Sequence, residues 1–244
     1  HCCRLYNCNT IYIPYYLCPT VKRFLLEHSI EVRSYFINED FEPLNIRQEK
    51  GEAILLVNYF GIFASNKIKK LANKFHNVII DNSAAFYSGP LEDCYNVYSP
   101  RKFFGVPDGC YVIGDYAEKY VCEYDQDFSS PTASFLFKRI EFSTSETYDE
   151  RMKNEERIDN SGILKMSLLT KSLLSNVDYL AIKRKRLYNF QYAHELFSGI
   201  NKLDPTIFVD NECVPMVYPL LIEQVGLDDK LKVNKIYTGR WWKS

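Results

Sequence analysis

The chain has 244 residues, of which 46% are hydrophobic and 25% are charged, as is typical of a globular protein with one large core or a domain plus a smaller second one. Its formal net charge of -1 excludes a general attraction to nucleic acid or to an anionic membrane surface. No apolar run approaches the roughly 18 residues that span a bilayer, and we expect no signal peptide before the first predicted strand.

The eight cysteines are scattered along the chain, and none of them forms a Cys-x-x-Cys pair. The four histidines do not cluster near them, so we predict no zinc site. Most of the cysteines lie inside apolar runs, which predicts small buried hydrophobic residues in a reducing compartment, and therefore a cytoplasmic protein. They are Cys2, Cys3, Cys8, Cys18, Cys94, Cys110, Cys122 and Cys213.

Short apolar strands alternate with helices in the first half of the chain. The predicted strands cover 10–15, 31–37, 53–57 and 78–80, and the predicted helices cover 19–28 and 66–75. Ser65 is the expected N-cap of the second helix. This alternation indicates a sheet of parallel strands covered by helices on both faces. We therefore expect an α/β fold, a three-layer sandwich with a mostly parallel central sheet.

The pattern changes after Gly109. A strand is expected over 110–113, and the charged stretch 138–160, which is nearly free of aliphatic residues, predicts a solvated helix with loops. Leucines at helical spacing predict one long helix from Leu164 to about Phe197. The basic run 183–186 lies within it, and we interpret this run as a solvated helix face rather than a nucleic-acid patch.

Three regions follow from this pattern. We predict a large α/β domain over 1–165, a connecting helix over 166–199, and a small C-terminal α+β domain over 200–244, where strand-like runs are interrupted by prolines. The chain starts at His1 without a methionine, and Trp241 and Trp242 carry large surfaces that prefer burial. We therefore expect both end regions to be incomplete parts of a longer protein.

An aspartate and a lysine form a candidate functional pair. Asp81 closes an apolar strand, at the carboxyl end where ligands bind in open α/β sheets. Lys102 follows 21 positions later (102 minus 81), and its neighbours Phe103, Phe104 and Val106 would favour the neutral, nucleophilic amine. Pyridoxal phosphate (PLP) chemistry needs a lysine that holds the cofactor aldehyde as a Schiff base and a carboxylate that keeps the pyridine nitrogen protonated. Taken singly, an aspartate after a strand is commonly a turn cap, and a lysine is commonly a surface residue.

Four segments share one order with the motifs of a known enzyme family. Ile11-Tyr12-Ile13-Pro14 is similar to the strand VIVPSFTF, and Val57-Asn58-Tyr59-Phe60-Gly61 is similar to the strand end VHLYG. Ile79-Ile80-Asp81-Asn82-Ser83-Ala84-Ala85 is similar to IEDAAQA. Ser99-Pro100-Arg101-Lys102, followed by Pro107-Asp108-Gly109, is similar to the S-x-x-K…GDGG segment. On these segments the chain resembles the DegT/StrS family of PLP-dependent sugar aminotransferases, within the aspartate-aminotransferase (fold type I) superfamily.

The resemblance implies a function and a cofactor site. The cofactor would be pyridoxal 5'-phosphate, bound through Lys102, which also moves a proton between the amino donor and the cofactor. Asp81 would pair with the pyridine nitrogen, and Ser83 and Ser99 would be candidates to bind the ring oxygen or the phosphate. The implied reaction transfers an amino group, typically from glutamate, to a nucleotide-linked keto-sugar for surface polysaccharide or lipopolysaccharide. The implied partners are these nucleotide-sugar and amino-acid substrates and a second copy of the chain in a homodimer, with no nucleic acid and no membrane.

The chain departs from the family at several positions. Asn58 replaces the histidine of VHLYG, Ala84 replaces a polar residue, and Cys110 replaces the second glycine of the DGG motif. The aromatic residue that usually stacks on the cofactor falls near Cys18, with Tyr15 close by and Tyr16 next to it. The family's GT-x-AL segment, which holds the phosphate at a helix N-terminus, is expected upstream of position 1.

Two alternatives remain open. The family also contains dehydratases, but these replace the lysine by histidine, and Lys102 argues against that activity. The chain could instead be a non-catalytic remnant or interaction domain that retains the PLP-transferase fold, an alternative favoured by Asn58 and Ala84. A visible absorption band from bound cofactor would distinguish this alternative from an aminotransferase.

Overall fold

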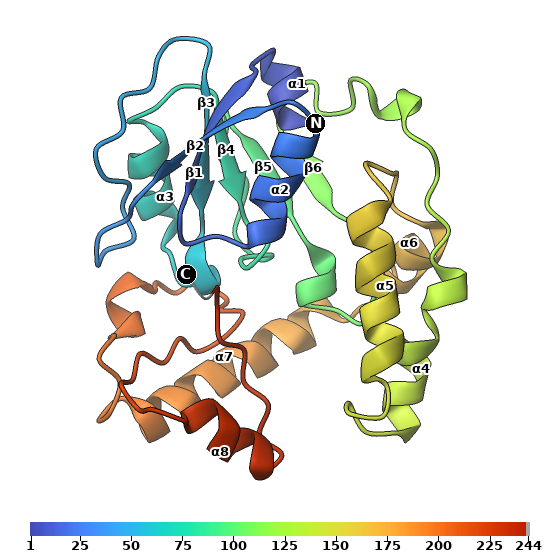
Figure 1. The fold of residues 1–244 in the computed structure, drawn as a ribbon. Helices are drawn as coiled ribbons and strands as arrows, with labels where there is room; N and C mark the ends of the chain where they lie inside the picture. Colours follow the sequence, from blue (N-terminus) through green and yellow to red (C-terminus); the bar gives the residue numbers. More distant parts are fainter. Residues whose placement is uncertain (243–244) are drawn as a thin grey trace.

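A computed structural model describes residues 1–242, which contain a six-stranded sheet (Figure 1). The strands are β1 (Thr10–Pro14), β2 (Glu31–Tyr35), β3 (Ala53–Val57), β4 (Val78–Asp81), β5 (Tyr95–Tyr98) and β6 (Tyr111–Ile113). Their order is β2-β1-β3-β4-β5-β6; the neighbours from β2 to β5 pair in parallel, and β6 is antiparallel to β5. The expected α/β class with a mostly parallel central sheet is confirmed.

Helices cover both faces of this sheet. Residues Pro19–Glu27 form α2, between β1 and β2, and residues Ser65–Ala72 form α3, between β3 and β4. The two connections run in opposite directions along the sheet, and right-handed crossovers therefore place their helices on opposite faces. In Figure 1, α2 lies in front of the strands and α3 lies behind them. A further short helix, α1 (Cys2–Tyr6), precedes β1 and was not predicted from the sequence.

The core is centred on β3, whose five residues are all buried. Burial on both sides is what a near-continuous apolar strand needs in a parallel sheet covered by helices. The register pairs Val57 with Asp81 and Asp81 with Val97, so the carboxyl ends of β3, β4 and β5 lie level with one another. Polar side chains that follow these strands are thereby brought to one edge.

The N-cap predicted for α3 is wrong. Ser65 is the first residue of the helix itself, and the cap position is Ala64. The Ala64 carbonyl accepts the backbone N–H groups of Lys67 (2.9 Å) and Ile68 (3.4 Å), and this starts the helical turn one residue earlier than expected.

The single long helix expected from Leu164 to Phe197 is also wrong, because two helices occupy this stretch. The first, α6 (Leu168–Leu174), ends where the Tyr179 hydroxyl donates a hydrogen bond to the Leu174 carbonyl at 2.9 Å. The second, α7 (Tyr179–Phe197), starts where the Asp178 side chain accepts the Ala181 N–H at 2.8 Å. The charged stretch before them forms α4 (Ser134–Glu141) and α5 (Tyr148–Asn160).

The remaining elements are short. They are the 3-10 helices η1 (Tyr59–Gly61), η2 (Pro100–Lys102), η3 (Val121–Glu123), η4 (Ser130–Thr132) and η5 (Pro205–Phe208), and the helix α8 (Leu227–Val233). Figure 1 shows α7 crossing beneath the end of the sheet at which β1 and β3 finish, with α4 and α5 to one side.

The strands expected beyond Leu203 are wrong, since the described residues from 203 to 242 contain none. This part of the chain instead bonds to the loop that follows β3. The Ala64 N–H donates to the Phe208 carbonyl at 3.0 Å, and the Met216 N–H donates to the Phe60 carbonyl at 2.8 Å. The Phe208 carbonyl and the Met216 N–H are thus satisfied by the loop after β3 rather than by a neighbouring strand.

Residues 1–242 include no helix that is both long and apolar enough to cross a bilayer. Within the same residues, no group of three or more His, Cys, Asp or Glu side chains is placed to hold a metal ion. The prediction of buried cysteines holds for half of them: Cys2, Cys3, Cys8 and Cys213 are buried, whereas Cys110 and Cys122 are exposed and the other two are half-buried.

Candidate active site at the carboxyl edge of the sheet

The candidate site lies where β3, β4 and β5 end. Asp81 is the last residue of β4, Asn58 follows β3, and Ser99 follows β5. The backbone ladder continues beyond the strands, with the Asn58 N–H donating to the Asp81 carbonyl at 3.0 Å and the Asn82 N–H donating to the Val97 carbonyl at 2.8 Å. The parallel strands thus hold these residues at one edge of the sheet.

Three of the four predicted site residues meet at this edge. The Asp81 Oδ1 atom accepts the backbone N–H of Ser83 at 2.8 Å, in the short turn that an aspartate after a strand commonly caps. The Ser83 Oγ atom accepts a hydrogen bond from Lys102 Nζ at 3.1 Å. Ser83 therefore links the carboxylate and the amine, which come from different strand ends.

Ser99 has a different position. It is the N-cap residue of η2, and its carbonyl accepts the Lys102 N–H at 3.4 Å. Its side chain is half-buried and makes no hydrogen bond to Asp81, Ser83 or Lys102 among the described residues. Ser99 thus shapes the backbone that carries Lys102, whereas its hydroxyl remains available to a ligand.

The apolar residues predicted to surround Lys102 are its neighbours in sequence, but their side chains do not surround its amine. Phe103, Phe104 and Val106 are buried in a cluster with Leu174, whereas the Lys102 side chain is exposed. The Lys102 amine lies 5.9 Å from the ring centroid of Trp241, within the range of a cation–π contact. Burial of the phenylalanines therefore anchors η2 without desolvating the amine.

Trp241 and Trp242 belong to this edge, and sequence reasoning did not assign them to the site. The Trp241 ring lies 4.9 Å from that of Phe60, and the Trp242 ring lies 4.9 Å from that of Tyr16. The only sequence signal was the preference of two adjacent tryptophans for burial. Of the aromatic residues expected near the cofactor, Tyr16 lies in this group, whereas Tyr15 is exposed and stacks on Phe36.

Asn58, which replaces the family's histidine, lies in a buried polar cluster. It is 1% exposed, and its Nδ2 donates to Asn82 Oδ1 at 3.0 Å and to Ser88 Oγ at 3.2 Å. The Asn58 Oδ1 atom is buried and has no hydrogen-bond partner within residues 1–242. An unpaired buried acceptor costs about 1–3 kcal/mol, so this oxygen lowers the stability of the fold.

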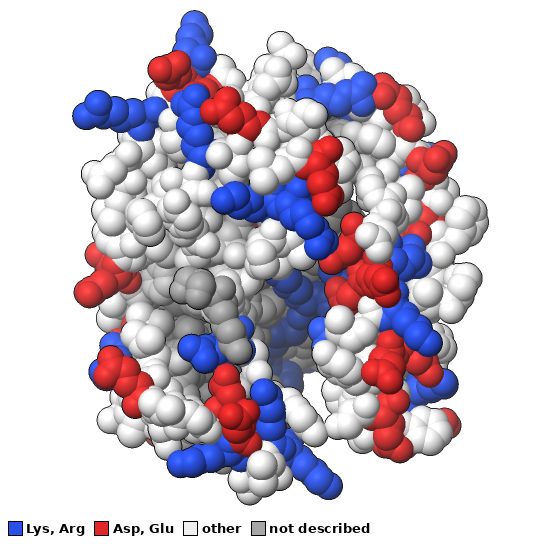
Figure 2. Space-filling model, viewed as in Figure 1, with Lys and Arg blue, Asp and Glu red and all other residues white. Residues whose placement is uncertain are grey.

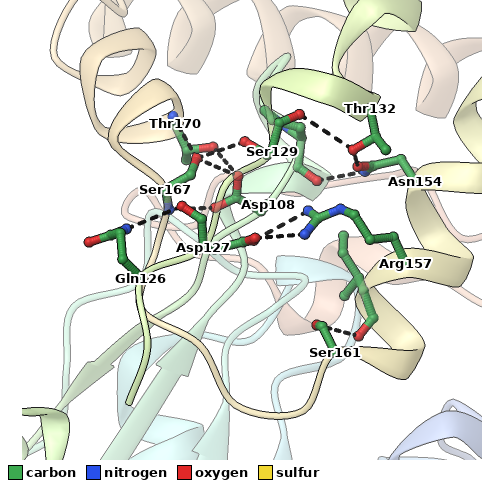
Figure 3. Close-up of polar contacts among 12 residues, drawn as sticks. Asp108, Gln126, Asp127, Ser129, Thr132, Asn154, Arg157, Ser161, Ser167 and Thr170 are labelled. Atoms are coloured by element: carbon green, nitrogen blue, oxygen red, sulfur yellow. Dashed lines mark hydrogen bonds and ion pairs between the residues drawn. The ribbon is translucent and has the colours of Figure 1, made fainter. Parts of the chain in front are cut away.

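A second buried polar network fixes the segment that follows Lys102 (Figure 3). The Asp108 carboxylate is 3% exposed and accepts the Ser167 N–H at 3.0 Å, the Ser167 hydroxyl at 2.6 Å and the Thr170 hydroxyl at 2.8 Å. Burial by itself would raise the pKa of Asp108, but hydrogen bonds from Ser129, Ser167 and Thr170 outweigh it and lower the pKa below its ordinary value. Asp108 is therefore a buried anion that ties the loop after η2 to the start of α6.

The same network reaches α5. The Asn154 Nδ2 donates to the Pro107 carbonyl at 2.8 Å, and Asn154 Oδ1 accepts from the Thr132 hydroxyl at 2.7 Å. Arg157 makes two parallel hydrogen bonds to the Asp127 carboxylate, at 2.6 and 3.2 Å (Figure 3). The loop after Lys102 is thus held on two sides, by α5 and by α6.

Positive charge gathers around η2. Figure 2 shows this face of the molecule hollowed near its middle, with Lys and Arg side chains inside the hollow. Arg101 pairs with Glu155 at 2.8 Å. Arg186 lies 4.4 Å from the Phe103 ring and donates to the carbonyls of Phe103 and Met216, at 3.2 and 2.9 Å. Arg184 and Lys185 are exposed, as a solvated face requires, but Arg186 is half-buried and bonded to two backbone carbonyls, so that interpretation is wrong for Arg186. This burial lowers the pKa of Arg186.

A cavity in the described part of the chain lies away from these residues. It measures about 460 Å³ and lies at the opposite edge of the sheet, near the amino ends of β4 and β5, where Asn77, Val78 and Cys94 line it together with Lys69 and Asp93. It contains none of the four predicted site residues.

Comparison with known proteins gives few matches. No protein-family model and no curated protein sequence matches the chain. The solved structures that are similar to it include two aminotransferases. An alanine aminotransferase from Pyrococcus furiosus shares 12% identity with a TM-score of 0.42, over 82% of this chain and 53% of that one. A PLP-bound putative aminotransferase from Clostridium difficile 630 shares 13% identity with a TM-score of 0.35, over 77% of this chain and 52% of that one. The chain thus spans about half the length of either structure.

Proposed function

We propose that the chain is the α/β part of a PLP-dependent aminotransferase with a fold of type I. The proposal rests on one observation, the convergence of the Asp81 carboxylate and the Lys102 amine on Ser83 at the carboxyl edge of a parallel sheet. Ligands of open α/β sheets bind at this edge. A carboxylate and an amine are also the two groups that this cofactor needs most.

The available atoms of these residues fit the cofactor. One oxygen of Asp81 accepts the Ser83 N–H, and Asp81 Oδ2 has no hydrogen-bond partner within residues 1–242, so it can accept a hydrogen bond from a protonated ring nitrogen. The Lys102 amine is exposed and can reach an aldehyde carbon by leaving Ser83. The hydroxyls of Ser83 and Ser99 are the candidates for the phosphate or the ring oxygen.

When bound, the cofactor supplies an electron sink for bonds to the α-carbon of an amino acid. Lys102 would hold the cofactor covalently and move a proton to and from the α-carbon of the amino donor. Asp81 would keep the ring nitrogen charged. The network of Asp108, Ser167 and Thr170 would keep η2, and with it Lys102, in a fixed position.

The finer proposal follows the resemblance of the four sequence segments. The amino donor would be glutamate, and the acceptor would be a nucleotide-linked keto-sugar that is used for surface polysaccharide. The active enzyme would be a cytoplasmic homodimer.

Cofactor capture tests the proposal directly. The protein is titrated with pyridoxal 5'-phosphate, reduced with borohydride, and digested for mass spectrometry. We expect a yellow protein whose reduced adduct maps to Lys102, and Lys102→Ala or Lys102→Arg should abolish that adduct. Lys22→Arg, at an exposed lysine on α2, is the matched control and should leave it unchanged. An adduct on another lysine would refute the assignment.

The non-catalytic alternative is favoured by the exposure of Lys102. A folded protein that forms no adduct, and that leaves glutamate unchanged in the presence of the cofactor, would support this alternative over an aminotransferase.

A further inference from the structure

Trp241 occupies a defined place at the carboxyl edge. Its ring centroid lies 5.9 Å from Lys102 Nζ and 4.9 Å from the ring of Phe60, the second residue of η1. Its neighbour Trp242 packs 6.2 Å from Tyr59 and 4.9 Å from Tyr16. The two tryptophans thus divide the edge, with Trp241 beside the amine and Trp242 over the aromatic residues that follow β1 and β3.

The surface on which Trp241 packs is fixed by the fold. Phe60 has φ 60°, a conformation that is a genuine outlier for a bulky residue, and Gly61 follows with φ 72°. Such backbone conformations persist only where the surroundings hold them, and here the Phe60 carbonyl accepts the Met216 N–H at 2.8 Å. The Phe60 ring is buried, so it offers Trp241 a rigid support.

We infer that Trp241 is the aromatic surface on which a flat, ring-bearing aldehyde stacks when Lys102 captures it. The inference rests on the proposed function, in which that aldehyde is pyridoxal 5'-phosphate. A ring attached through one carbon to Nζ can reach the indole by rotation about the intervening bonds, because the amine lies 5.9 Å from the centroid of the Trp241 ring. Stacking of a heterocycle on an aromatic side chain is strong enough that its removal weakens binding by about 10- to 100-fold.

The capture step needs no further reagent. The Lys102 ammonium loses a proton to solvent, its nitrogen bonds to the aldehyde carbon, and the aldehyde oxygen leaves as water. The nitrogen beside Trp241 then carries the captured compound. The ring of that compound replaces the ammonium group as the group that contacts the indole.

Two aldehydes separate stacking from covalent capture. Pyridoxal carries a ring and propanal does not, and borohydride traps both at Lys102 for quantification by mass spectrometry. Trp241→Ala should weaken the capture of pyridoxal by about 10- to 100-fold and leave that of propanal unchanged. Trp241→Phe should retain most of the pyridoxal affinity. Trp242→Phe changes the other tryptophan of the edge, and it should weaken the capture of pyridoxal less than Trp241→Ala does.

Fluorescence gives a second measurement that does not need the alanine variant. The chain has two tryptophans, so Trp242→Phe leaves Trp241 as its only tryptophan, and Trp241→Phe leaves Trp242. Propanal does not absorb the emission of tryptophan. Its capture at Lys102 should change the emission of the Trp242→Phe protein and not that of the Trp241→Phe protein.

The possible failures are distinguishable. If Trp241→Ala captures pyridoxal as tightly as the unaltered protein, or more tightly, Trp241 is a cover rather than a stacking surface, and the inference is wrong although Lys102 still binds the aldehyde. If the unaltered protein forms no Lys102 adduct with either pyridoxal or pyridoxal 5'-phosphate, the proposed function and the inference both fail.

Discussion

Asp81 and Ser83 are joined by a hydrogen bond of 2.8 Å from the Ser83 N–H to the Asp81 carboxylate. This contact closes the turn after β4 and leaves the Ser83 hydroxyl free to accept from Lys102 at 3.1 Å. The carboxylate therefore has a structural role that can be separated from a cofactor role, because an asparagine can preserve the first and not the second.

The variants Asp81→Asn and Asp81→Ala distinguish the structural role of the carboxylate from its cofactor role. The asparagine Oδ1 can still accept the Ser83 N–H, so the free energy of unfolding should stay within about 0.5 kcal/mol of the original, whereas alanine should lose about 1 kcal/mol. Both variants should bind pyridoxal 5'-phosphate more weakly, since neither supplies a charge to the ring nitrogen. Urea unfolding and absorbance titration measure the two effects. An Asp81→Asn protein that binds the cofactor normally would contradict the proposed role.

Asp108→Asn should destabilise the protein by about 2–3 kcal/mol at pH 7, because the amide cannot accept all the hydrogen bonds that Ser167 and Thr170 donate to the carboxylate. The pKa of Asp108 is lowered in the folded state, and the unfolded chain has a value of about 3.9. The stability due to the anion is therefore complete above that value and is lost as the pH falls through the lower, folded pKa.

Unfolding curves at several pH values check this sign. The difference in unfolding free energy between the original protein and Asp108→Asn should be largest near pH 7 and should shrink as the pH falls below about 4. A difference that grows on acidification would mean that Asp108 is protonated in the folded protein.

Arg157→Ala should cost about 3 kcal/mol, because it leaves the nearly buried Asp127 carboxylate without its partner. Arg157→Lys retains the charge but not the pair of parallel hydrogen bonds. Its thermal stability should lie between that of the original protein and that of Arg157→Ala. Arg4→Ala, which breaks the exposed pair with Glu123, is the control and should change little. Equal losses of unfolding free energy in Arg157→Ala and Arg4→Ala would show that the burial of the Arg157–Asp127 pair does not increase its effect on stability.

Gly61→Ala should destabilise the fold by more than the roughly 1–2 kcal/mol that a left-handed conformation costs a residue with a side chain. Gly61 has φ 72°, and a Cβ atom there would lie 2.5 Å from the Ala84 carbonyl oxygen, in the turn that follows Ser83. At Gly89 a Cβ would meet open space, and Gly89→Ala should change the stability by less than about 1 kcal/mol. Denaturant unfolding of the two variants compares them, and similar results would argue against close packing at Gly61.

The sequence alone was sufficient to predict the parallel part of the sheet. The strands β3 and β4 are short apolar runs, and a strand that is apolar on both sides must be covered on both faces. Asp81 ends such a run, so its place at the carboxyl edge also followed from the local pattern. Its link to Lys102 through Ser83 did not, because two strand ends meet only when the register of the sheet is set.

Tertiary structure decided the features in which a polar group finds a distant partner. The strand β5 was missed because it contains Asn96, which is poorly suited to a strand by itself. In the fold Asn96 is fully buried and exchanges hydrogen bonds with the backbone of Leu91, at 2.8 and 3.0 Å. The break before α7 likewise depends on Tyr179 reaching back to Leu174. Hydrophobic periodicity is a local signal that indicates which face is buried, but the satisfaction of buried polar groups depends on residues far apart in sequence and is determined only once the chain has folded.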